Sequence, residues 1–158
     1  MVRIAFHSIP AENQTVKGMI MAMASNGIYI HCELMFSDGS VGYSNKECGI
    51  VLKSVKDRDY STDWVFYEVP CNSFQESEMK KLFTDNQHLK YNWTGLFGNM
   101  VTGLNFDFTG GQFCSQVCFN ALVNAKVMQS YEFIPSEVSP SNLQAIIQKL
   151  NLKLCKSY

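Results

Sequence analysis

The chain has 158 residues, of which 46% are hydrophobic and 17% charged, and its formal net charge at pH 7 is −1. This length suits one domain with a substantial core, and the composition excludes an intrinsically disordered chain. The near-zero charge, with no basic run longer than the Lys80-Lys81 pair, argues against a nucleic-acid partner. No apolar segment is long enough to span a bilayer, so we expect no stable membrane insertion.

The first residues, Met1 to His7, lack the apolar core of a signal peptide, so we expect a cytoplasmic protein in a reducing compartment. Its six cysteines are then expected to be reduced. The sequence contains no C-x-x-C motif and gives Cys114 and Cys118 no paired histidines, so it predicts no metal site and no cofactor. The oligomeric state stays open.

The first part of the chain is predicted to form mainly strands. Alternating and β-branched segments predict them at residues 2–6, 28–36, 41–45, 49–55 and 64–69. The pattern of residues 13–24 predicts a helix between the first two strands. Asp38-Gly39 predicts a two-residue hairpin turn, and residues 56–63 are expected to form a polar loop.

The second part of the chain is predicted to be helical. Asn72 or Ser73 caps a helix that runs to about Leu89, and Ser139 caps a last helix with Pro140 at its first position. Helices are expected at residues 73–89, 91–100, 114–125 and 140–150, with a loop at 104–112 and a tail or short strand at 151–158. With no repeat or linker, we expect one domain over residues 1–158, of α+β class, in which an antiparallel sheet packs against helices.

The helix predicted from residue 114 begins with a cysteine that follows a glycine pair. Small or apolar residues recur behind it at Val117, Cys118, Ala121, Leu122 and Ala125. Cys114 would then lie in the first turn, on the face that looks into the protein. The dipole and free N–H groups of a helix start favour a thiolate there. Cys114 is therefore a candidate nucleophile, and the alternative is that it is the first residue of a core stripe.

The strand predicted at residues 28–36 offers a base. Its alternation places His31 and Glu33 on one face, with Cys32 and Leu34 on the other. Imidazole is the usual acceptor of a cysteine proton near neutral pH. Glu33 is the first choice as the residue that orients His31. A two-residue turn makes Ser44 the second choice and Tyr43 the third, although a slip of one residue exchanges those two. An ordinary solvated strand face is the alternative.

Three motifs together carry a resemblance to a known group of proteins. They are the segment beginning His31-Cys32-Glu33, the segment Tyr91-Asn92-Trp93, and Phe113-Cys114-Ser115-Gln116. In this order they resemble the circularly permuted papain-fold families of the NlpC-type superfamily, above all the YiiX/YaeF-like families and related phage and viral members. The resemblance covers roughly residues 2 to 145. It implies a small barrel-like sheet whose histidine precedes the cysteine in the chain.

The resemblance also implies roles for individual residues. Cys114 matches the nucleophile, His31 the base and Glu33 the acidic residue two positions after it, while Tyr91 matches an aromatic residue that lines the site. Gln116 departs from the family, which often has glutamate there. We add three candidates for substrate binding. Gln112 stands beside the nucleophile, Trp93 belongs to a bulky rim, and Ser44 stands opposite Glu33 in the predicted hairpin. Each is equally explained as a loop or core residue.

These observations predict a thiol hydrolase of the cysteine peptidase or amidase type. It would act through an acyl-enzyme on a peptide, amide, ester or acyl-thioester substrate, in an intracellular and viral or phage-associated setting. A lipid or thioester acyltransferase on the same fold is an alternative. So is a non-catalytic binding module in which Cys114 and His31 are relics. A redox pair of Cys114 with Cys118 is disfavoured, because thiols four residues apart on a helix seldom reach disulfide geometry.

Overall fold

The computed structural model describes residues 1–9, 27–60, 63–87, 89–91, 112–129 and 134–155. The helix predicted at 13–24, the greater part of the segments predicted at 91–100 and 104–112, and Trp93 lie outside these residues. Within them the strands are β1 (Val2–Ser8), β2 (Tyr29–Met35), β3 (Ser40–Asn45), β4 (Gly49–Ser54), β5 (Trp64–Val69) and β6 (Leu154–Cys155). The helices are α2 (Ser73–Asp85), α4 (Cys114–Asn124) and α5 (Pro140–Lys149), with short 3-10 helices η2 (Val55–Asp57) and η3 (Pro135–Glu137).

The strands form one antiparallel sheet in the order β4-β3-β2-β1-β5-β6. The predicted α+β class, with an antiparallel sheet packed on helices, is therefore confirmed. This part of the chain forms an open sheet with β4 and β6 at its edges, so the barrel-like closure implied by the resemblance does not appear in it.

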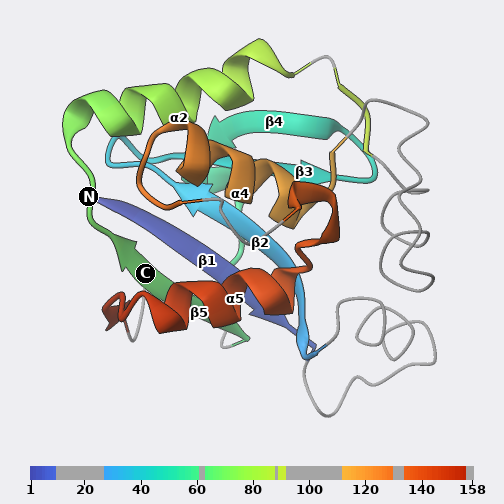
Figure 1. Ribbon diagram of the computed structural model, residues 1–158. Coiled ribbons are helices and arrows are strands. Elements are labelled where there is room, and N and C mark those ends of the chain that lie inside the picture. The colour runs from blue at the N-terminus through green and yellow to red at the C-terminus, as the bar shows by residue number, and fades with distance from the viewer. Residues whose placement is uncertain (10–26, 61–62, 88, 92–111, 130–133, 156–158) are drawn as a thin grey trace.

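The three helices cover one face of the sheet (Figure 1). Their buried side chains, such as Phe83 and Phe119, share a core with Ile4, Phe6 and Leu34 from the strands. The opposite face carries a second, smaller core. Its members are Ala5, Met35, Val41, Tyr43, Val55, Trp64 and Phe66. Both faces are thus buried over part of their area, which lets polar residues on either face lie out of water.

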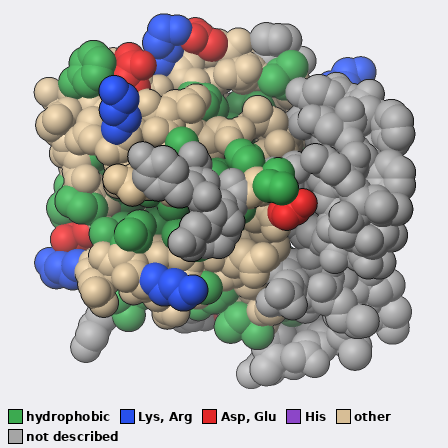
Figure 2. Space-filling model, viewed as in Figure 1, with side chains coloured by type: hydrophobic (Ala, Val, Ile, Leu, Met, Phe, Trp, Pro, Cys, Tyr) green, Lys and Arg blue, Asp and Glu red, His purple; other side chains and the backbone are tan. Residues whose placement is uncertain are grey.

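A connecting segment covers this second face. Residues 55–63 join β4 to β5, and the strand order places β3, β2 and β1 between these two strands. Its described residues, 55–60, therefore run onto the face opposite the helices, where Val55 and Tyr60 pack against the smaller core. On the face seen in Figure 2, Lys and Arg side chains lie among acidic and hydrophobic ones.

The helix caps follow the sequence prediction. Asn72 caps α2 in a reciprocal pair of hydrogen bonds with Gln75, and the Ser139 hydroxyl accepts from the Asn142 N–H at the start of α5. The predicted end of α2 near Leu89 is wrong, because the helix ends at Asp85. The chain turns at Asn86 and the Leu89 carbonyl accepts from the Ile50 N–H, which ties this segment to β4.

The predicted hairpin register between β2 and β3 is wrong by one residue. Phe36 and Ser40 close a three-residue loop, and Leu34 lies opposite Gly42. Gly39 adopts a φ of 81°, the left-handed conformation that a three-residue hairpin loop needs at its last position. Extending this register by alternation puts Tyr43 on the face of Glu33 and places Ser44 on the opposite face.

The predicted alternation of β2 holds from His31 onward, and it fails at Tyr29. The pairing of β1 with β2 shifts register between His7 and Ser8. The Tyr29 ring consequently lies 5.8 Å from that of Phe6, on the helix-bearing side of the sheet.

Within the described residues, no helix has the length and apolar character needed to cross a membrane.

The side chain of Phe83 packs α2 against β3. Its side chain is fully buried, and a Cβ on Gly42 would stand 2.7 Å from its ring, so only glycine fits beneath it. Replacing Phe83 with alanine is expected to lower the free energy of unfolding by about 3–5 kcal/mol, measured by urea denaturation. Phe74→Ala, on the same helix but 72% exposed, is the control and should change stability by less than about 0.5 kcal/mol. Equal losses in both variants would contradict this packing argument.

Candidate functional site

Cys114 is the first residue of α4, as predicted, and its side chain is buried. Phe113 precedes the helix in an extended conformation and provides no side-chain cap. The predicted apolar stripe is buried, but so are Ser115, Gln116 and Phe119. The prediction of a single buried face was too narrow, because α4 is a central helix that packs against β2, β3, α2, α5 and η3.

An opening in the sheet brings Cys114 to His31. β2 pairs with β1 at six positions, whereas it pairs with β3 only at Leu34–Gly42 and Met35–Val41. At this opening the Ser44 hydroxyl donates to the Gln112 carbonyl at 2.7 Å, which anchors the chain two residues before the cysteine. The chain just before α4 is therefore held against β3, where β3 is no longer paired with β2. A cysteine on the helix-bearing side can there reach a histidine from the opposite face.

The side chains of Cys114 and His31 interact, and the interaction favours the charged form of each. Burial alone would lower the pKa of His31, but the Cys114 thiolate and the Glu33 carboxylate raise it to about 10. A hydrogen bond from Cys32 lowers the pKa of Cys114 well below its usual range, and the His31 imidazolium lowers it further, against the effect of burial. Both shifts favour the ionised pair, a Cys114 thiolate beside a His31 imidazolium.

Glu33 lies behind His31, as the sequence predicts. Its side chain is fully buried, and its Oε2 lies 3.7 Å from His31 Nε2 and 2.9 Å from Arg58 Nη2. Burial would raise the pKa of Glu33, but His31, Arg58 and Tyr60 together hold it below its ordinary value. The Tyr43 ring also borders this group, with its centroid 5.9 Å from that of His31.

Two residues of this cluster were missed by sequence reasoning. Arg58 and Tyr60 lie in the segment predicted only as a polar loop. The sequence carries no local signal for them, because only the strand order shows that the connection from β4 to β5 crosses β2 and places side chains over His31 and Glu33. The sequence places Cys32 on the face opposite His31, and it gives no sign that the Cys32 thiol interacts with Cys114 and Cys118.

The predicted substrate-binding residues that the structure describes have different surroundings. Tyr91 is close enough to the candidate thiol to be affected by it: burial raises the pKa of Tyr91, and the charge of Cys114 raises it further. The Gln112 side chain accepts a hydrogen bond from Asn120 at 3.2 Å, so it lies along α4. Ser44 binds the chain before the helix and does not share the face of His31. Trp93 lies outside the described residues.

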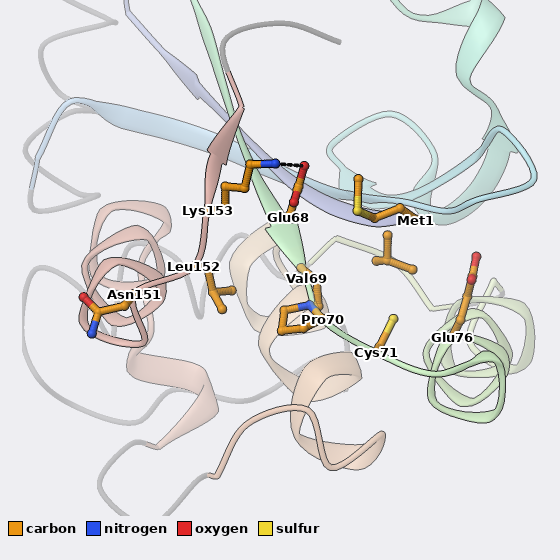
Figure 3. A pocket seen from close by; sticks show the side chains of 10 residues that line it. Met1, Glu68, Val69, Pro70, Cys71, Glu76, Asn151, Leu152 and Lys153 are labelled. Carbon is orange, nitrogen blue, oxygen red and sulfur yellow. Dashed lines mark hydrogen bonds and ion pairs between the residues drawn. The ribbon is translucent and has the colours of Figure 1, made fainter.

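Two cavities help to locate the site. One, of about 370 Å³, is bordered by Val2 and Val69, with the Glu68–Lys153 ion pair beside it (Figure 3). Val2 and His7 occupy opposite ends of β1, and His7 pairs with His31, so this cavity lies away from Cys114. The other, of about 450 Å³, is bordered by residues 46–49 and 89–91 and adjoins the site through Tyr91.

Among the residues that the structure describes, no three His, Cys, Asp or Glu side chains are grouped to hold a metal ion. Comparison of the chain with protein-family models, with curated proteins and with solved structures finds no match. The interpretation of the site therefore rests on its own geometry.

Proposed function

We propose that this protein is a thiol hydrolase of the cysteine peptidase or amidase type, on a permuted papain-like fold. The observation that carries the proposal is the buried pair of Cys114 and His31 at a helix start, with the Glu33 carboxylate behind the imidazole. Nucleophile, base and orienting group thus follow one another in space, which is the general arrangement of a catalytic triad. In the chain, the strand that carries His31 comes before the helix that begins at Cys114, and this order supports the permuted fold.

The reaction follows from these positions. The Cys114 sulfur attacks the carbonyl carbon of an amide, ester or thioester, and the carbonyl electrons move to its oxygen. The first N–H groups of α4 have no carbonyl partner within the helix and would donate to that oxyanion. His31 then gives its proton to the leaving group, and the acyl group stays on Cys114. His31 next takes a proton from water, which attacks the acyl-enzyme and restores the thiolate.

The cavity beside Tyr91 would receive part of the substrate. Its lining combines an aromatic ring with Lys46, Glu47 and Lys90, so it offers both an apolar and a charged surface. Transfer of the acyl group to an acceptor in place of water would use the same first half-reaction. A non-catalytic module would instead have no use for an ionised Cys114.

The pH dependence of alkylation tests the proposal. Iodoacetamide is expected to modify Cys114 at a rate that changes little between about pH 6 and 8, because the thiolate is already formed there. A thiol that is protonated at pH 6 gains about tenfold in rate per pH unit over most of that range. The exposed Cys48 is followed in the same sample as an internal control. Peptide mass spectrometry measures both rates in one sample. Since Cys114 is buried, the shape of the profile is the readout and the absolute rate is not.

A Cys114 profile that rises as steeply as that of Cys48 would show an un-ionised thiol and would refute the proposed nucleophile. A flat profile with no acyl transfer from any activated ester would leave the ion pair in place and favour the binding module.

A further inference from the structure

The Arg58 guanidinium lies next to the candidate site, and Arg58 is not one of the three proposed catalytic residues. Arg58 follows η2, in the segment that crosses the sheet from β4 to β5. Its Nη2 lies 2.9 Å from Glu33 Oε2, and that same oxygen lies 3.7 Å from His31 Nε2. The same Glu33 oxygen therefore lies close to two cationic groups, the His31 imidazolium and the Arg58 guanidinium.

The guanidinium is held by more than the carboxylate. Its central carbon lies 4.5 Å from the Tyr43 ring centroid and 5.9 Å from that of Trp64. The Arg58 backbone N–H donates to the Val55 carbonyl at 3.1 Å, which fixes the start of the side chain. Tyr43 and Trp64 also pack edge-on against the His31 ring. The same two aromatic rings thus border both the histidine and the arginine.

The charges of the group require a second cation. Cys114, His31, Glu33 and Arg58 alternate in sign, and their sum is zero. Without Arg58, a thiolate and a fully buried carboxylate would compete for one imidazolium. Leaving a buried carboxylate with insufficient compensation is costly, and taking up a proton relieves that cost. A protonated Glu33 would no longer hold the imidazolium by charge.

We propose that Arg58 is a positioning residue that holds the charged Glu33 carboxylate against His31 and so keeps the imidazolium aligned with Cys114. This inference rests on the proposed function. It adds a fourth member to the site, and that member acts on the reaction only through Glu33.

Neutral and charge-preserving variants of Arg58 test the inference. In Arg58→Gln, the midpoint of Glu33 titration, followed by carboxyl carbon NMR and assigned with Glu33→Gln, is expected to rise by about one to three pH units. The rate of Cys114 alkylation should fall along the same acidic limb. Arg58→Lys keeps the charge and should stay within about one pH unit of the wild type in both measurements. Lys153→Gln, which neutralises the cation of the Glu68–Lys153 ion pair, is the control for loss of one positive charge and should change neither.

The outcomes separate this inference from the proposed function. An unshifted Glu33 midpoint in Arg58→Gln would overturn the inference, and so would a shifted midpoint that Cys114 reactivity does not follow. If the alkylation rate of wild-type Cys114 rises with pH as steeply as that of Cys48, the proposed function fails. If wild-type reactivity is present and survives in Arg58→Gln, only the role of Arg58 fails. Arg58→Met provides the same comparison should the glutamine variant not fold, as judged by circular dichroism.

Discussion

Replacing Cys114 with serine is expected to lower the turnover of an activated ester such as p-nitrophenyl acetate by at least about 10³-fold. The serine hydroxyl stays protonated at neutral pH, so the imidazolium that stabilises a thiolate has no anion to stabilise. The wild type should release nitrophenolate in a burst and carry an acetyl group on Cys114. Stopped-flow absorbance and peptide mass spectrometry measure the two signals.

Two other cysteines supply matched controls. Cys48 is exposed, and Cys155 is half-buried on β6. Cys48→Ser and Cys155→Ser should keep the burst within about threefold, because neither side chain contributes to the thiolate–imidazolium pair. A burst that survives in Cys114→Ser, or acetylation spread evenly over the cysteines, would show that the nucleophile has been assigned wrongly.

Local sequence patterns were sufficient for the parts of the site that lie within single elements. The start of α4 at Cys114 follows from a glycine-led segment and a helical stripe. The shared face of His31 and Glu33 follows from the two-residue period of a strand. Both depend on neighbouring residues alone, so they could be predicted without knowledge of the tertiary structure.

The contacts between elements could not be predicted in this way. The meeting of Cys114 with His31 depends on β2 and β3 diverging after two paired positions, and no local pattern encodes that. The hairpin register depended on a loop of two or three residues, and Asp38-Gly39 suits both. Arg58 was missed because a loop residue acquires its role only from the path of the loop, and that path is set by the strand order.

Replacing His31 with alanine is expected to lower the rate of Cys114 alkylation at pH 6 by at least about 10²-fold. His31 keeps its proton at this pH, because its pKa is raised to about 10, and its charge keeps Cys114 ionised. Without it, a thiol with a pKa near 8.5 or above is less than about 1% thiolate at pH 6. Ester hydrolysis should fall further, since the proton acceptor and donor of both half-reactions is lost.

His7 provides the matched control for this variant. It lies directly opposite His31 in the β1–β2 pairing and stacks on Trp64, with ring centroids 4.7 Å apart. His7→Ala should therefore disturb the same aromatic cluster and change the Cys114 rate at pH 6 by less than about threefold. Equal losses in both variants would assign the effect to packing and would contradict an electrostatic role for His31.

The upper end of the pH range gives an independent check on the same variant. As the pH rises through about 10, the wild-type imidazolium loses its proton and its stabilisation of the thiolate disappears. The thiol of His31→Ala becomes ionised over the same range. The two alkylation profiles are expected to differ most near pH 6 and to converge above pH 10. A difference that stays constant across the whole range would mean that His31 affects access to Cys114 and not its ionisation.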